Sequence, residues 1–192
     1  MSSSLTELPR RRVTERQAEM VRRLADAAVV EIRSKGYNGL TVRKVAARAG
    51  VAAATAYTYF ASKDHLIAEV FWRRIRELPR PAINRRRNAP ARVAAALDDL
   101  TSLLASEPEL AAASTTALLA NDPDVKHLRD RVGAEIRHRL ETALGDDDGE
   151  AVLRALDLAV AGAMIQAGMG HLPYTELPAR VSEVASLLMR GR

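Results

Sequence analysis

Apolar residues recur along the chain with the 3.6-residue period of amphipathic helices. In residues 14–35 the apolar positions form one stripe, which ends at Gly36. The period predicts further short helices over residues 41–49, 52–59 and 62–78. Beyond residue 90 it predicts five longer ones, over about 93–104, 108–120, 122–144, 150–168 and 175–189. Because no segment favours a strand, we predict an all-α fold of about nine helices.

Residues 41–60 contain two short helices separated by a glycine. The Thr41 hydroxyl can cap the first helix, and the backbone can reverse cheaply at Gly50 because glycine adopts left-handed angles. Thr55, Tyr57 and Tyr59 lie near the surface of the second. This outline is typical of a helix-turn-helix, whose second helix enters a DNA major groove, but ordinary helical hairpins share the spacing.

The side chains of residues 20–70 add a specific motif, carried by Gly36-Tyr37, Thr41-Val42, Val45-Ala46, Ala49-Gly50-Val51, Thr55, Tyr57, Tyr59-Phe60 and Ser62-Lys63-Asp64. In this register the stretch resembles the DNA-binding head of the tetracycline-repressor (TetR) family. The resemblance implies an N-terminal three-helix helix-turn-helix head and a C-terminal helical domain for effector binding and dimerisation. It does not extend through the rest of the chain.

The chain divides into three predicted regions. Residues 1–13 are expected to be a disordered basic arm ending in Arg10-Arg11-Arg12, with either a minor-groove contact or no role. Residues 14–61 are the predicted DNA-binding domain. Residues 62–192 are the predicted effector-binding and dimerisation domain, which a helix over 62–78 links to the head.

The charge distribution supports a polyanionic partner for the N-terminal half. The net charge is +5, but residues 1–88 carry 19 Lys and Arg against 8 Asp and Glu, whereas residues 89–192 carry 10 against 16. A basic head on an acidic body is the electrostatic footprint of nucleic-acid binding. A solvated arginine-rich surface is the alternative when charge is considered alone.

By resemblance, DNA contacts are expected from Thr41, Arg43, Ala53, Ala54, Thr55, Tyr57, Tyr59 and Lys63. Thr41 and Lys63 would contact phosphates, and Arg43 would bond guanine in the major groove. One of Tyr57 and Tyr59 can instead be a core aromatic. The sequence departs from the family at Ala52, where a capping serine is usual, and at Ala54 and Ala56.

The family resemblance also implies a homodimer and an internal effector cavity. Candidate dimer residues are Leu156, Val160, Ala163, Met164, Ala167, Val181, Val184 and Leu188. Candidate cavity residues are Trp72, Leu100, Leu104, Leu118, Met164 and Gln166; for both sets, intramolecular core is the alternative. Because only 4% of residues are aromatic and no charged cluster stands out, we expect an aliphatic or acyl-type effector rather than a planar cation.

Other functional classes have little support in the sequence. There is no cysteine, and the four histidines lack metal-ligand spacing, so we expect no metal site and no cofactor. The N-terminus has no signal-peptide core, and the longest uncharged run, residues 158–170, is too short for a bilayer. We therefore predict a bacterial cytoplasmic protein, nucleoid-associated when bound to DNA. The leading hypothesis is a dimeric repressor of a near-palindromic operator, released by a small molecule. The alternatives are an activator or an effector-independent regulator controlled by a protein partner, and then an enzyme.

Overall fold

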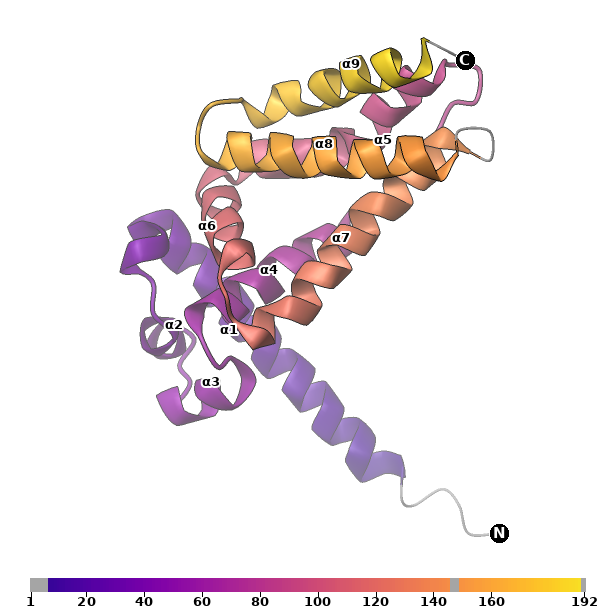
Figure 1. Ribbon diagram of the computed structural model, residues 1–192. Helices are drawn as coiled ribbons and strands as arrows, with labels where there is room; N and C mark the ends of the chain where they lie inside the picture. The colour runs from indigo at the N-terminus through magenta and orange to yellow at the C-terminus, as the bar shows by residue number, and fades with distance from the viewer. Residues whose placement is uncertain (1–6, 146–148, 191–192) are drawn as a thin grey trace, which may run out of the picture.

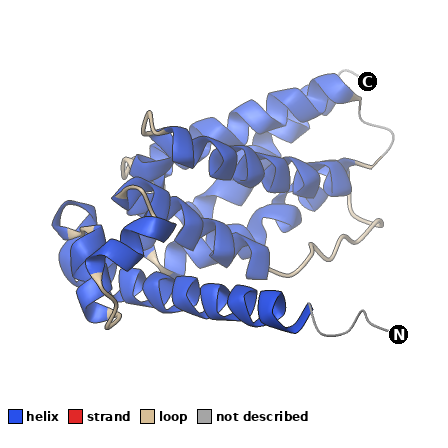
Figure 2. Cartoon of the chain, turned by 90° about the horizontal axis from the view of Figure 1, so that it is seen from below, coloured by secondary structure: helices blue, strands red, loops and turns tan. Residues whose placement is uncertain are grey.

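A computed structural model describes residues 7–145 and 149–190 of the 192-residue chain, and these residues form a helical molecule without strands (Figures 1 and 2). The elements are α1 (Glu7–Gly39), α2 (Val42–Arg48), α3 (Ala53–Tyr59), α4 (Lys63–Glu77), α5 (Ala89–Ser106), α6 (Pro108–Leu119), α7 (Pro123–Leu144), α8 (Glu150–Gly168), the short 3-10 helix η1 (Tyr174–Glu176) and α9 (Leu177–Met189). The predicted all-α class of about nine helices is confirmed.

Short polar side chains set the starts of several helices. The Thr41 hydroxyl accepts a hydrogen bond from the backbone N–H of Lys44 at 3.2 Å, and the Ser62 hydroxyl accepts one from His65 N–H at 3.0 Å. Each bond satisfies an amide that has no partner inside its helix. Gly50 has a φ of 64°, which turns the chain from α2 towards α3.

The first helix is longer than the sequence predicts. Residues 7–13, which the sequence assigns to the N-terminal arm, belong to α1 in the structure. Residues 1–6 and 146–148 lie outside the described residues. At Gly36 the backbone leaves helical geometry with a φ of 63°, close to the predicted end of the helix.

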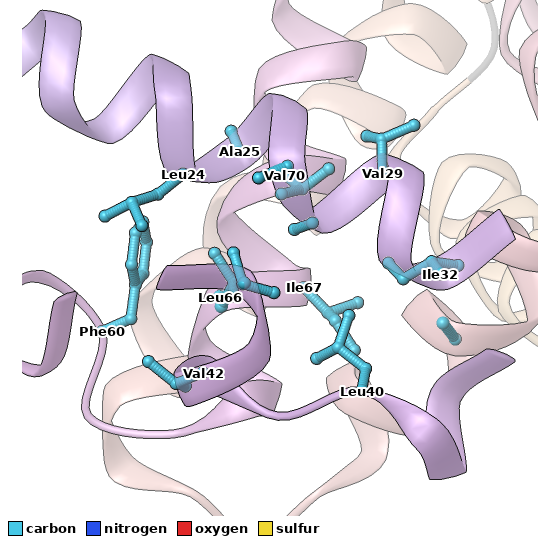
Figure 3. Packing of buried hydrophobic residues seen from close by; sticks show 14 of the residues in the cluster. Leu24, Ala25, Val29, Ile32, Leu40, Val42, Phe60, Leu66, Ile67 and Val70 are labelled. Atoms are coloured by element: carbon cyan, nitrogen blue, oxygen red, sulfur yellow. The ribbon is translucent and has the colours of Figure 1, made fainter. Parts of the chain in front are cut away.

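The core of the N-terminal head is formed by α1 to α4 together with α6. Leu24 and Ile32 of α1, Val42 of α2, Phe60 after α3 and Ile67 of α4 are buried together (Figure 3). The cluster also contains residues from α6, namely Leu110, Ala113 and Ala117. The head and body therefore share α6 as a packing element.

A second core holds the body together. It joins α5, α7, α8 and α9 through buried aliphatic residues such as Leu97, Leu140, Leu156 and Val181. Figure 1 shows α6, α7 and α8 as three sides of a triangle, and α4 packs against both α6 and α7. This frame places side chains of α4, α6, α7 and α8 around a common cleft.

Candidate nucleic-acid interface and effector cavity

The second helix of the helix-turn-helix, α3, is held by few side chains and leaves most of its surface open. Ala56 is its fully buried residue, and Tyr59 is half-buried against the head core. Ala54 is exposed, as is Tyr57 with 51% of its surface accessible, whereas Ala53 and Thr55 are half-buried. The structure thus gives Tyr57 the surface position and Tyr59 the partly internal one.

The first turn of α3 is weakly capped, and a polar residue on its open face was missed by the sequence reasoning. Ala52 occupies the N-cap position and makes no side-chain hydrogen bond. Thr58 is exposed, and its hydroxyl donates to the carbonyl oxygen of Thr55 at 2.6 Å. An exposed residue one position after Tyr57 could have been found from the helical period alone.

Arg43 is available for a ligand outside the chain. It lies on the exposed face of α2 and makes no hydrogen bond or ion pair with a described residue. The neighbouring Lys44 is engaged, because its Nζ donates to the Gly39 carbonyl oxygen at 2.7 Å. A free guanidinium at this position is chemically able to bond the O6 and N7 atoms of guanine.

Lys63 lies in a cluster that holds the start of α4 against the turn after α1. Its Nζ is 3.8 Å from the centroid of the Tyr37 ring and 3.4 Å from the Tyr37 carbonyl oxygen. The Tyr37 hydroxyl donates to Asp64 Oδ1 at 2.6 Å. Burial, followed by this hydrogen bond, raises the pKa of Tyr37 to about 12. The cluster fixes the ammonium group of Lys63 while leaving N–H groups for a phosphate.

Two further contacts brace α2 against α1. The Arg23 guanidinium donates to the Ala49 carbonyl oxygen at 2.5 Å, at the end of α2. Arg48 pairs with Glu31, a buried carboxylate of α1, at 2.5 Å. These contacts hold α2 against the long α1 and so give Thr41 and Arg43 a firm platform.

The body contains two adjoining cavities between α4, α6, α7 and α8, with volumes of about 180 Å³ and about 420 Å³. Phe71, Leu118, Ala161 and Met164 line both. The smaller one is also lined by Leu104, Ala111, Ser114, Thr115, Leu119, Arg129 and Ile165, and the larger one by Val132, Gly133, Ile136, Arg137, Asp157 and Val160.

The structure brings three of the six predicted cavity residues together: Leu104, Leu118 and Met164. Leu100 lies in the buried core, and Trp72 packs against the cluster of Ala68, Val125 and Leu128; neither lines the two cavities. Gln166 is corrected outright. It is exposed and lines a separate surface groove between α8 and α9, because it projects from the opposite side of α8 to Met164.

Four of the predicted dimer residues lie inside the monomer. Leu156, Val160 and Val181 form the contact of α8 and α9 with α5 and α7, and Ala167 of α8 is also buried. Met164 and Val184 are half-buried, and Leu188 remains exposed. The apolar residues that α8 and α9 leave most open are instead Leu158, Ile165, Met169 and Leu187.

No group of three or more His, Cys, Asp or Glu side chains suited to a metal ion occurs within residues 7–145 and 149–190. A basic helix-turn-helix on a helical body is the arrangement of DNA-binding transcriptional regulators.

Comparisons with known proteins agree with this class. Residues 24–70 match the family model described as bacterial regulatory proteins, tetR family. A Mycobacterium tuberculosis protein described as an uncharacterised HTH-type transcriptional regulator is 43% identical over 202 residues, covering 99% of this chain and 94% of that protein. The HTH-type transcriptional repressor KstR of Rhodococcus jostii is 30% identical over 145 residues, covering 73% of this chain and 68% of KstR.

Solved structures show the same fold. A TetR transcriptional regulator from Rhodococcus sp. RHA1 superposes with a TM-score of 0.72 at 21% identity, covering 91% of this chain and 98% of that one. The TetR-family repressor FadR of Thermus thermophilus, in complex with lauroyl-CoA, has a TM-score of 0.66 at 19% identity, with 89% and 94% covered. The chain belongs to the TetR family: it is a helix-turn-helix transcriptional regulator, not an enzyme.

Proposed function

We propose that this regulator is a repressor that binds a near-palindromic operator as a homodimer and leaves it when a small molecule occupies the body cleft. The observation that carries the proposal is the position of α6. One face of α6 belongs to the core of the head, and the other forms a wall of the cleft.

Both ends of α6 are tied to neighbouring helices. Glu107, the residue before the helix, pairs with Arg74 of α4 at 3.4 Å and with Arg33 of α1 at 3.9 Å. At the other end, Arg129 of α7 donates to the carbonyl oxygens of Leu118 and Ala120. A ligand that displaces α6 therefore acts on α1 and α4, and through them on the spacing of two DNA-binding heads. Only a ligand that prefers the displaced state shifts the equilibrium.

The lining of the cleft supports an aliphatic or acyl-type effector. Its shared wall consists of Phe71, Leu118, Ala161 and Met164, which present carbon and sulfur atoms and one aromatic ring. The lauroyl-CoA complex of the Thermus thermophilus FadR repressor shows that this fold can accommodate an acyl compound. A planar cation would find one aromatic ring, that of Phe71, and one lining carboxylate, Asp157, which is already paired with Arg137.

A dimer is supported by the apolar surface that α8 and α9 leave uncovered. Leu158, Ile165 and Met169 lie along one side of α8, and Leu187 adds to it from α9. Between the two helices lies a groove of about 390 Å³, lined by small and aliphatic residues such as Gly162, Ala163 and Val184. A second copy offers the same surface, so the pair can form a twofold interface.

The helix α8 also has the length and mean hydropathy of a membrane span, with 28% of its apolar window buried. One such helix is weak evidence for a membrane, because core helices pass the same test. Arg154 and Asp157 interrupt it, and Asp157 pairs with Arg137 of α7 at 2.7 Å. We therefore infer that the exposed face of α8 contacts a partner subunit, and that the protein acts on chromosomal DNA in the cytoplasm.

The proposal is tested by release from DNA. An operator is first selected from random duplexes, and a metabolite library is then screened for compounds that lower binding. Gly133→Leu is the matched blocking variant, because Gly133 lines the larger cavity and a Cβ added there meets no atom within 4 Å. We expect it to bind operator normally but to resist release, whereas Gly133→Ala responds as the wild type does. Equal release of both variants would place the effector elsewhere.

A further inference from the structure

The smaller cavity has a polar group that the folded chain leaves unused. Ser114 is 1% exposed and lines this cavity, yet its hydroxyl has no hydrogen-bond partner. Its neighbour Thr115 also lines the cavity but is satisfied, because its hydroxyl donates to the Ala111 carbonyl oxygen at 3.1 Å. A buried hydroxyl without a partner costs free energy, which a ligand oxygen or nitrogen can recover.

The same cavity carries a cation at its rim. Arg129 is exposed and donates through Nε and one terminal nitrogen to the carbonyl oxygens of Leu118 and Ala120, at 2.6 Å and 2.8 Å. Its other terminal nitrogen, Nη1, makes no hydrogen bond, and within the part of the chain that is described no carboxylate pairs with it. The nearest acid in sequence, Asp130, is held by Lys126 at 2.7 Å. The guanidinium therefore has both charge and N–H groups to offer.

The larger cavity offers no comparable charge. Its one cation, Arg137, is paired with Asp157, Glu150 and Glu141 at 2.7, 2.7 and 3.0 Å. The remaining wall, including Val132, Ile136 and Val160, is apolar. An anion placed here would meet the Asp157 carboxylate and an arginine already paired with three carboxylates, whereas an alkyl chain would meet carbon atoms.

We propose that the effector is an aliphatic chain with an anionic end, oriented with its polar end in the smaller cavity. The Ser114 hydroxyl donates to an oxygen of that end, and Arg129 supplies the countercharge. The chain passes Phe71 and Met164 into the larger cavity. This assignment rests on the proposed effector-controlled function. It adds the charge of the effector, its orientation in the two cavities and the two residues, Ser114 and Arg129, that bind its polar end.

The test uses four twelve-carbon probes, each below its micelle-forming concentration: dodecanoate, dodecanoyl-coenzyme A, methyl dodecanoate and dodecylamine. Binding to the full-length protein is followed by the fluorescence of Trp72, the one tryptophan of the chain. Trp72 reports on the cleft because it and Leu118, which lines both cavities, pack on the same buried cluster. We expect the two anionic probes to bind more tightly than the ester, and the amine to bind most weakly. The anion that binds more tightly then shows whether the protein recognises the free acid or the coenzyme A thioester.

Arg129→Gln tests the charge. Loss of a charge-assisted hydrogen bond should weaken the anions by about 10- to 100-fold while the methyl ester changes by less than about threefold. Arg129→Lys keeps the charge and should recover part of the loss. A merely structural role for Arg129 would weaken all probes equally. Ser114→Ala should weaken every oxygen-bearing probe without lowering the melting temperature of the free protein, because it removes an unsatisfied hydroxyl.

The proposal is overturned if the ester binds as tightly as the anions, if the amine binds best, or if Arg129→Gln lowers all affinities alike. It is also overturned if no probe binds. These failures are separate from failure of the proposed function, which is measured on the same preparation as operator binding and as release by other compounds.

Discussion

At the scale of single residues, the DNA-reading surface has few polar groups. Ala54 on α3 offers only a methyl group, Thr55 is half-buried, and the exposed Thr58 hydroxyl is directed to a backbone carbonyl. Methyl groups can contact thymine but distinguish few base pairs. Sequence discrimination is therefore expected to depend on the free guanidinium of Arg43 and on DNA shape.

Replacing Arg43 by alanine should relax selectivity at one base pair in each half-site. The expected cost is about 1–3 kcal/mol of binding free energy, the contribution of one bidentate guanine contact. Operator selection with the variant measures this. Arg131→Ala, on α7, is the control, because Arg131 is exposed, lies far from the head in sequence and does not line the groove between α8 and α9. An unchanged base preference in Arg43→Ala would show that Arg43 does not contribute to base recognition.

Tyr37→Phe should lower the free energy of unfolding by about 1 kcal/mol at neutral pH, because the hydrogen bond to Asp64 is lost. The pKa of Tyr37 is raised from 10.0 to about 12, so folding favours the neutral phenol. That stabilisation is present below pH 10 and is lost as the pH rises towards 12. Urea unfolding from pH 8 to 12 should show the wild-type advantage shrinking. A constant difference would contradict the assigned cause.

At the scale of elements, the starts of α4 and α7 are joined. The Ser62 hydroxyl donates to Asp122 Oδ2 at 2.5 Å, and Asp122 also accepts from Asp124 N–H at 2.8 Å. The Ser62 hydrogen bond is the main cause of the lowered pKa of Asp122. This contact links the first turn after the helix-turn-helix to a helix that lines the cleft.

Ser62→Ala and Asp122→Ala should each destabilise the protein by about 0.5–2 kcal/mol, since each removes a helix cap. Because the two side chains share a hydrogen bond, the double variant should lose less than the sum. The pKa of Asp122 is lowered in the folded state, so its contribution is present above about pH 4 and lost as the pH falls further. Chemical unfolding of the four proteins at pH 7 and pH 3 measures both effects. Strict additivity would show that the caps act independently.

The contact of α6 with α8 depends on a glycine. A Cβ on Gly168 would lie 2.5 Å from Thr115 Oγ1 and 2.9 Å from Thr115 Cβ. Gly168→Ala should therefore cost about 1–3 kcal/mol by overpacking. The matched Gly133→Ala, where the added methyl meets nothing within 4 Å, should stabilise α7 by up to about 1 kcal/mol. Thermal unfolding distinguishes the two; an equal effect would contradict the packing described for α6 and α8.

The sequence predicted the helices and their caps well because these follow from local signals. The period of three to four residues located α4, and Thr41 and Ser62 located the starts of two helices. The sequence was a poor guide to which face of a helix is buried where apolar residues surround the whole helix. In α8 both Leu156 and Leu158 fit an apolar stripe, yet the first is buried and the second is 76% exposed. Only the packed neighbours decide between them.

At the scale of the whole molecule, the same limit applies to contacts between distant segments. Nothing local marks Leu110 and Ala113 as part of the head core, since they lie far in sequence from α1 and α4. The cleft residues Ser114 and Arg129 were missed for this reason. The family motif, in contrast, is continuous in sequence, so the residues expected to contact DNA could be proposed before the fold was known.

Leu158→Glu should prevent dimerisation without unfolding the subunit, because the side chain is open to solvent in the monomer. In the dimer the carboxylate would be buried without a partner, at a cost of about 3–5 kcal/mol. Light scattering at micromolar concentration measures the change. Val30→Glu, an equally drastic change at another exposed apolar position, should remain dimeric. Should the Leu158 variant also stay dimeric, the interface would lie elsewhere.

The central claim is that two copies of this chain place α3 in successive major grooves of one inverted repeat. Fluorescence anisotropy with a selected operator, its isolated half-site and a random duplex tests this most directly. We predict two chains per full operator, much weaker binding to the half-site and an affinity that falls steeply with salt. Equal affinity for all three duplexes, or one chain per operator, would contradict the account.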